Sequence, residues 1–182
     1  MKRFLFAIVI AAAACVVASA EGSEADGLGL GYSVGERGGD FSVGVEATSP
    51  CLLSGHLAFR AAGEVLWKEG VPLSSSEETW KPYYLARLGA LVRARTEGPF
   101  RLYGEFGGAC IFPIEELCAS TTAIPAIYGL FGFELPVADG SPGCYFIELG
   151  STGVFGAGAD LMSGEPMLAH GFAARAGFRW FF

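Results

Sequence analysis

The feature that most constrains the fold is an alternation of apolar and other side chains with a period of two, and it is clearest at the end of the chain. One parity of the last segment is apolar throughout: Phe172, Ala174, Ala176, Phe178, Trp180 and Phe182. The opposite parity carries Gly171, Arg175, Gly177 and Arg179, together with Ala173 and Phe181. In a β-strand the two sets face opposite sides of the sheet. The pattern therefore predicts a strand with one apolar face.

Seven earlier segments show the same alternation. They cover residues 27–35, 41–48, 56–64, 84–93, 100–106, 127–134 and 145–150. Alternating segments of about ten residues are typical of transmembrane β-strands. Eight of them in succession predict an all-β chain with eight strands.

Apolar residues are abundant but dispersed. The chain is 52% hydrophobic, 13% aromatic and rich in glycine, and its mean hydropathy is +0.43. After the amino-terminal segment, however, no stretch approaches the roughly 20 apolar residues of a membrane-spanning helix. A closed β-barrel is the other structure that pairs every backbone donor and acceptor internally and can therefore span lipid. We expect a closed antiparallel up-and-down transmembrane β-barrel of eight strands.

A secreted soluble barrel of the lipocalin type has the same period, so the alternation alone does not separate the two folds. The face that carries arginine, glutamate and glycine does separate them, since it would make an outer surface that is sparse in charge. Beyond the amino-terminal segment the only lysines are Lys68 and Lys81, and both fall in one expected loop. A soluble barrel would spread solvated groups over its outer strand faces. The membrane barrel is therefore favoured.

The polar face then lines the lumen of the barrel. It carries five glutamates and six arginines: Glu46, Arg60, Glu64, Arg87, Arg93, Arg101, Glu105, Glu134, Glu148, Arg175 and Arg179. We expect them to form ion pairs, because an unpaired ion inside is costly and the arginine fork binds carboxylates with two hydrogen bonds. An eight-stranded interior is just wide enough to be filled by side chains. This favours a packed ionic plug over a conducting path and excludes a wide general porin.

The amino terminus is typical of a secretory signal peptide. A basic start at Lys2 and Arg3 precedes an apolar run over residues 4–17 and a small-residue cleavage site that ends at Ala20. This divides the chain into a signal peptide, residues 1–20, and a barrel, residues 21–182. A second reading is a lipoprotein cut at Cys15, but a branched apolar residue is usual where Ala12 stands.

The carboxy terminus carries a resemblance to a known family. Gly177-Phe178-Arg179-Trp180-Phe181-Phe182 follows the pattern glycine, apolar, any, aromatic, any, aromatic. It resembles the closing strand of bacterial outer-membrane β-barrels, and the mature chain resembles their small eight-stranded family. The resemblance implies that Gly177, Phe178, Trp180 and Phe182 are the signal read by the barrel-assembly machinery. It also implies localisation in the cell outer membrane, with outer-membrane lipid as a partner.

Loop lengths fit such a barrel with both termini in the periplasm. The expected periplasmic turns, residues 49–54, 96–99 and 136–143, are short. Three of the outer links, residues 65–82, 113–122 and 152–168, are longer, as is usual for this class. The first outer link is a tight glycine turn over residues 36–40.

Four cysteines remain after removal of the signal peptide, and four cysteines allow three pairings. The compartment permits disulfides. The expected topology favours Cys110–Cys118 at the outer side and, less strongly, Cys51–Cys144 at the periplasmic rim. Free thiols stay open as an alternative, because positions across a barrel can be too far apart to bridge.

Catalysis and nucleic-acid binding are not expected. The two histidines, His56 and His170, fall at opposite ends of the barrel, and no phosphate-binding loop, dinucleotide fingerprint or zinc-ligand spacing is present. We expect no cofactor or metal. The formal net charge is −7, and −9 once Lys2 and Arg3 are removed, which argues against nucleic acid.

Fold alone does not settle function. The leading expectation is a non-enzymatic envelope-structural or surface-interaction role through the outer loops, with an extracellular protein as ligand. Those loops carry Trp67, Glu69, Glu77, Glu78 and Trp80 in one link and Phe155, Asp160, Leu161 and Met162 in another. The alternative is a narrow channel for small or apolar solutes.

Overall fold

The computed structural model describes residues 27–70, 79–94, 100–115, 123–138, 140–154, 160–162, 165–166 and 171–182. Within them the chain forms strands and no helix. The strands are β1 (Gly29–Arg37), β2 (Asp40–Thr48), β3 (Leu57–Gly70), β4 (Thr79–Arg93), β5 (Arg101–Phe112), β6 (Ile124–Pro136), β7 (Gly143–Val154), β8 (Asp160–Met162), β9 (Glu165–Pro166) and β10 (Gly171–Phe181). The predicted signal peptide, residues 1–20, and its alternative cleavage at Cys15 lie outside the described residues.

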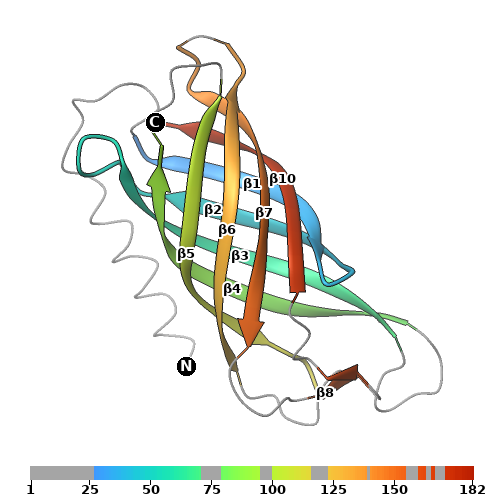
Figure 1. Ribbon diagram of the computed structural model, residues 1–182. Helices are drawn as coiled ribbons and strands as arrows, with labels where there is room; N and C mark the ends of the chain where they lie inside the picture. Colours follow the sequence, from blue (N-terminus) through green and yellow to red (C-terminus); the bar gives the residue numbers. More distant parts are fainter. Residues whose placement is uncertain are drawn as a thin grey trace.

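Eight of these strands close into one barrel, in the order β1-β10-β7-β6-β5-β4-β3-β2 (Figure 1). Every neighbouring pair is antiparallel. Closure is made by the first and last strands, where Gly29 pairs with Phe181 and Arg37 with Ala173. The prediction of an all-β, closed, antiparallel barrel of eight strands is confirmed.

The two ends of the barrel are named here by the chain segments that mark them. The C-terminal end is where β10 finishes, and the hairpin end holds the turn between β1 and β2. That turn has two residues, Gly38 and Gly39, both with positive φ (59° and 92°). Such a turn matches the twist of the flanking strands and favours glycine at both positions. The tight glycine turn expected from the sequence is confirmed.

Side chains alternate between the lumen and the outer wall as the sequence predicts. On β4, for example, Leu88 is 63% exposed, whereas its neighbour Arg87 is buried. On β10, Phe172 and Trp180 face outward and Arg175 and Arg179 inward. On each barrel strand the apolar set of alternating side chains forms the outer wall. The opposite, more polar set points inward and forms the buried interior.

Strands β3 and β4 are longer than the alternation suggested. The ladder continues to the pair Gly70 and Thr79, so Trp67, Lys68, Trp80 and Lys81 lie on strands and not in an outer loop. The placement of all four in a loop over residues 65–82 was wrong. Their polar and aromatic mixture resembles a loop sequence, but each strand supplies the hydrogen-bonding partners that keep the other extended.

The link between β7 and β10 also contains structure. β7 runs to Val154, and β8 and β9 pair as a separate two-stranded sheet near the hairpin end (Figure 1). Asp160, Leu161 and Met162, expected in a loop, therefore form β8. Phe155 lies outside the described residues.

Candidate functional site: the charged lumen

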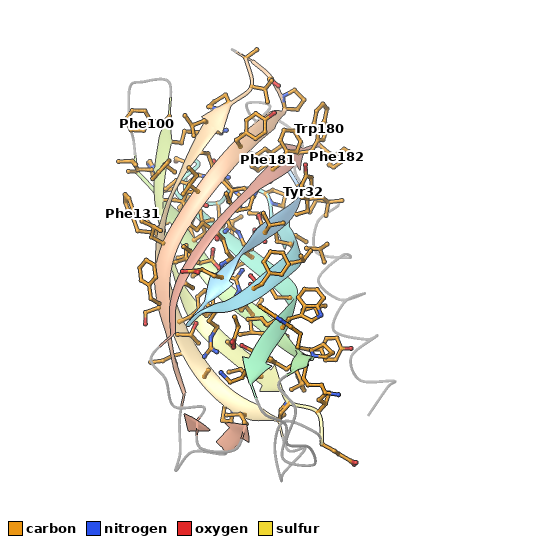
Figure 2. The ribbon with its side chains drawn as sticks, turned by 90° about the vertical axis from the view of Figure 1, so that its right-hand side faces the viewer. Tyr32, Phe100, Phe131, Trp180, Phe181 and Phe182 are labelled. Carbon is orange, nitrogen blue, oxygen red and sulfur yellow. The ribbon has the colours of Figure 1, made fainter. Side chains whose placement is uncertain are left out.

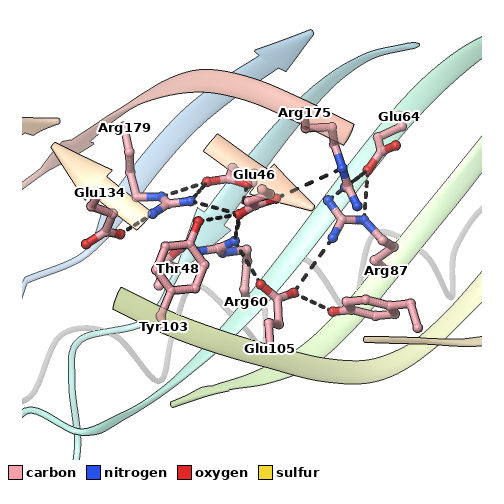
Figure 3. Close-up of polar contacts among 12 residues, drawn as sticks. Glu46, Thr48, Arg60, Glu64, Arg87, Tyr103, Glu105, Glu134, Arg175 and Arg179 are labelled. Atoms are coloured by element: carbon pink, nitrogen blue, oxygen red, sulfur yellow. Dashed lines mark hydrogen bonds and ion pairs between the residues drawn. The ribbon is translucent and has the colours of Figure 1, made fainter. Parts of the chain in front are cut away.

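The structure brings all eleven expected lumen residues into the barrel interior. Ten are buried, and Arg101 is partly exposed at the C-terminal end. They come from seven of the eight barrel strands, β2 to β7 and β10. Together they form the set called here the lumen cluster, most of which is drawn in Figure 3.

The middle of the lumen cluster is organised around Arg60 and Glu148. Arg60 Nη1 lies 2.5 Å from Glu148 Oε1 and 2.8 Å from Glu105 Oε2. Tyr103 donates its hydroxyl hydrogen to Glu148 at 2.6 Å, and Tyr128 donates to Glu105 at 2.5 Å. Hydrogen bonds to an ionised group are stronger than neutral ones, so these contacts compensate part of the cost of burying the charges.

A second group lies closer to the hairpin end and is centred on Glu64. Its Oε1 accepts from Arg87 Nε at 2.7 Å and from Arg175 Nη1 at 2.5 Å (Figure 3). The three side chains come from β3, β4 and β10, so this group ties together opposite walls of the barrel. Arg87 Nη1 also lies 3.8 Å from Glu105, which links this group to the middle one.

The third group lies toward the C-terminal end. Arg179 donates from Nε to Glu46 at 2.7 Å and also pairs with Glu134, and its guanidinium stacks over the Phe146 ring at 4.4 Å. Arg93 and Arg101 each lie 3.5 Å from Glu134. The Glu134 carboxylate therefore lies within ion-pair distance of three arginines.

On β3, β4 and β5 an apolar layer lies between the lumen cluster and the hairpin end. Leu66, Leu85 and Ile111 face inward from β3, β4 and β5 and are at most 2% exposed. They sit one inward step beyond Glu64 and Arg87 along their strands. Side chains therefore fill the barrel both by ion pairing and by apolar packing. No group of three or more histidine, cysteine, aspartate or glutamate side chains in the described part of the chain could hold a metal ion.

Beyond the apolar layer lies a set of residues that the sequence reasoning missed. Arg37, Asp40, Lys68, Lys81 and Tyr83 all share the inward parity at the hairpin end. Tyr83 donates to Asp40 Oδ2 at 2.6 Å, and Lys68 Nζ lies 3.6 Å from Asp40 Oδ1. The signal was in the sequence, because Lys68 continues the parity of Glu64, but these residues had been assigned to loops and turns.

No disulfide joins Cys51 and Cys144 in the described part of the chain. The expected Cys110–Cys118 pair lies partly outside the described residues. Cys51 and Cys144 do lie at the same end of the barrel, but Cys51 follows β2 whereas β7, which carries Cys144, stands three strands away in the barrel order. A disulfide needs Cα atoms within about 7 Å. The Cys110 thiol has the parity of the outer wall, and Cys118 lies outside the described residues.

The remaining expected residues are placed as follows. Phe178, Trp180 and Phe182 face the outer wall near the C-terminal end, and Gly177 has the inward parity (Figure 2 labels Trp180 and Phe182). His56 lies just before β3 at the same end, where its carbonyl accepts from the Arg93 amide. His170 lies outside the described residues.

Comparison with known proteins names no family for the chain. It matches no protein-family model, and a search of curated proteins finds none similar enough to count as a relative. Among the described residues no helix is long and apolar enough to cross a membrane.

Proposed function

We propose that this protein is an outer-membrane β-barrel with a non-enzymatic envelope-structural or surface-interaction role, exerted through the loops at its hairpin end. Its apolar wall contacts the lipid, and its lumen cluster fixes the barrel from inside. Its partners are outer-membrane lipid, the barrel-assembly machinery and an extracellular protein.

The main support for this proposal is that apolar side chains lie on the outside of the barrel and charged side chains lie inside. Large apolar residues are exposed on the wall of every barrel strand: Leu30, Tyr32, Val34, Phe41, Val43, Val45, Phe59, Tyr84, Leu88, Val92, Phe106, Ile127, Phe131, Leu135, Tyr145, Ile147, Leu149, Phe172 and Trp180. Glu36, at the hairpin end, is the one charged residue among the outward positions whose side chains are described. A water-soluble protein rarely exposes so continuous an apolar surface, whereas an apolar outer band is the hallmark of a barrel in lipid.

Aromatic pairs near the two ends of the wall add support. Toward the C-terminal end, the Phe178 ring lies 5.4 Å from Tyr145 and 6.3 Å from both Tyr32 and Trp180; Figure 2 labels Tyr32 and Trp180. At the hairpin end, the Phe41 and Trp67 rings lie 5.7 Å apart. Aromatic girdles of this kind flank the apolar band of membrane barrels at both lipid–water interfaces.

Because the interior is filled with side chains, the outer loops are the favoured location of the function. The arginines and glutamates of the lumen cluster pair with one another, and buried apolar side chains of β3, β4 and β5 fill space toward the hairpin end. These features favour a plug over a route for solutes. Activity then resides in the segments that connect β3 to β4, β5 to β6 and β7 to β10, where binding residues of small barrels are free to vary.

Fractionation tests the location directly. We expect the protein in the outer-membrane fraction of cells, with a gel mobility that shifts on heating because the folded barrel resists detergent. Recovery as a soluble periplasmic species in the absence of detergent would contradict the proposal.

A single charge on the wall gives a sharper test. Leu88 lies mid-strand on the outer wall, and Leu53 lies at the tip of the turn between β2 and β3 and is 73% exposed. In lipid, Leu88→Arg should cost about 2–4 kcal/mol of unfolding free energy, whereas an exposed substitution in a soluble protein changes it by only about 0.5 kcal/mol. Equilibrium unfolding in phosphatidylcholine vesicles measures the difference, with Leu53→Arg as the matched control. Equal stability of the two variants would argue against insertion.

A further inference from the structure

A groove lies in the outer wall of the barrel near the hairpin end, where β10 passes between β1 and β7 (Figure 1). Its volume is about 480 Å³, which is within the range of roughly 300–1,000 Å³ that is usual for small-molecule sites. The lining residues that face outward are Val34, Glu36, Phe41, Ile147, Ala174 and Ala176. This groove, called here the wall groove, therefore opens to the surroundings of the barrel and not to its lumen.

The wall groove exists because β10 carries two small side chains on its outward face. Ala174 and Ala176 form the floor, and Phe178 lies on the same face further along the strand. Ala176 pairs in register with Val34 on β1 and with Ile147 on β7, so larger side chains flank the floor on both sides. From Ala174 to Phe178 the strand advances by about 13 Å, at roughly 3.3 Å per residue. An apolar slot of this length suits a linear hydrocarbon chain.

One end of the wall groove carries a carboxylate. Glu36 pairs in register with Ala174 and with Phe41, so it lies beside the floor at the level of the Phe41–Trp67 ring pair. Aromatic girdles of membrane barrels mark the lipid–water interface, where lipid headgroups lie. The wall groove thus runs from the headgroup level toward the middle of the wall, with Glu36 at its headgroup end.

The charge of Glu36 determines which headgroup fits. Within the described part of the chain its side chain forms no ion pair, and the adjacent Arg37 and Arg175 point into the lumen, where Arg175 pairs with Glu64. The carboxylate therefore attracts a cation and repels an anionic headgroup. A primary ammonium adds N–H donors, and hydrogen bonds between two charged groups are the strong ones. A quaternary ammonium has no N–H and lacks this contribution.

We propose that the wall groove binds one lipid whose headgroup carries a primary ammonium. One acyl chain of the lipid lies over Ala174 and Ala176, between Val34 and Ile147, and the ammonium pairs with the Glu36 carboxylate. This inference rests on the proposed function, because it requires that the outer wall faces lipid, and it specifies which lipid the wall retains and where.

The test uses the full-length mature chain refolded in non-ionic detergent, with its fold checked by heat-modifiable mobility. Native mass spectrometry at increasing lipid concentration measures the affinity for the first bound lipid. The probes share dioleoyl chains and differ in headgroup: phosphatidylethanolamine, phosphatidylcholine and phosphatidylglycerol. Phosphatidylethanolamine should bind about fivefold more tightly than phosphatidylcholine, the upper end of what an accessible ion pair supplies, and phosphatidylglycerol should bind most weakly. Equal affinity for the ethanolamine and choline lipids would overturn the proposal.

Variants tie the binding to the wall groove. Glu36→Gln should bring the affinities for the ethanolamine and choline lipids close to each other, whereas Glu36→Asp keeps the charge and should keep the preference. Ala176→Phe fills the floor and should weaken the binding of both lipids about tenfold, because it displaces methylene groups from the groove. Ala61→Phe is the matched control, since it adds the same bulk to the outward face of β3 and should leave both affinities nearly unchanged.

A preference for phosphatidylethanolamine that persists in Glu36→Gln would overturn the proposal, and so would equal effects of Ala176→Phe and Ala61→Phe. If Ala176→Phe does not fold, the affinity ratio in Glu36→Gln decides alone. The result is separable from the fate of the proposed function. A protein that fractionates with the outer membrane and is destabilised by Leu88→Arg, but shows no headgroup preference, retains the proposed function and excludes this lipid site.

Discussion

At the scale of single residues, Glu148 has more described partners than any other glutamate of the lumen cluster. It accepts from Arg60 and from the Tyr103 hydroxyl, and it lies 3.7 Å from Arg179 and 4.0 Å from Arg175. Its side chain is 1% exposed. No water can replace the carboxylate easily at such a position, so its arginine partners depend on it directly.

Removal of the Glu148 carboxylate should therefore be costly. We expect Glu148→Ala to lower the unfolding free energy by about 3–5 kcal/mol, the range for breaking a buried pair and leaving charge uncompensated. Denaturant titration of the refolded barrel in detergent measures this loss. Glu36→Ala is the control: it removes an exposed carboxylate from the outer wall and should change the free energy by about 0.5 kcal/mol or less. Similar values for the two variants would show that the lumen charges are solvated.

At the scale of elements, the last strand has two adjacent phenylalanines in opposite environments. Phe181 is 2% exposed and lies beneath the guanidiniums of Arg93 and Arg101, at 5.3 and 5.8 Å. Phe182 is 71% exposed on the outer side (Figure 2). The folded state thus depends on Phe181 much more than on Phe182.

Because the two phenylalanines differ in burial, their variants can distinguish an effect on stability from an effect on assembly. Phe181→Ala should lower the unfolding free energy in detergent by about 3–5 kcal/mol, the usual cost of emptying a buried aromatic site. Phe182→Ala should leave that free energy nearly unchanged but reduce the amount of folded barrel in cells, because the terminal aromatic belongs to the expected assembly signal. Quantification of heat-modifiable protein over time after induction measures the second effect. Normal assembly kinetics in Phe182→Ala would contradict the role of the signal.

The sequence was sufficient to predict which segments form strands, but it was not sufficient to predict where each strand ends. The alternation is a local property, so it predicted the strand number, the parity of residues such as Leu88 and Arg87, and the membership of the lumen cluster. The length of β3 and β4 depends on pairing between distant segments, as between Gly70 and Thr79. The grouping of Asp40, Lys68 and Tyr83, and the separation of Cys51 from Cys144, depend on positions around the closed barrel, which the sequence predicts only coarsely.

At the scale of the whole molecule, the filled lumen predicts weak or absent conduction. The lumen cluster and the apolar layer leave side chains in contact across the interior, and an eight-stranded barrel has little further space. Planar-bilayer recordings of refolded protein should therefore show no steady current steps. Uniform single-channel steps that persist after shortening of the loops between β3 and β4 and between β7 and β10 would instead favour a narrow channel.

The ion pairs of the lumen also imply an order in which the parts of the barrel assemble. Arg179 and Arg175 belong to β10, the last of the eight barrel strands in chain order, and they pair with Glu46 and Glu64, which precede them by 133 and 111 residues. Before β10 arrives, those carboxylates lack these partners and the sheet has two open edges. Because contacts so distant in sequence form late, an incomplete barrel gains little from its early strands. We therefore expect assembly to proceed without long-lived partial forms. A chain that is shortened by one strand should be degraded and should not form a less stable barrel.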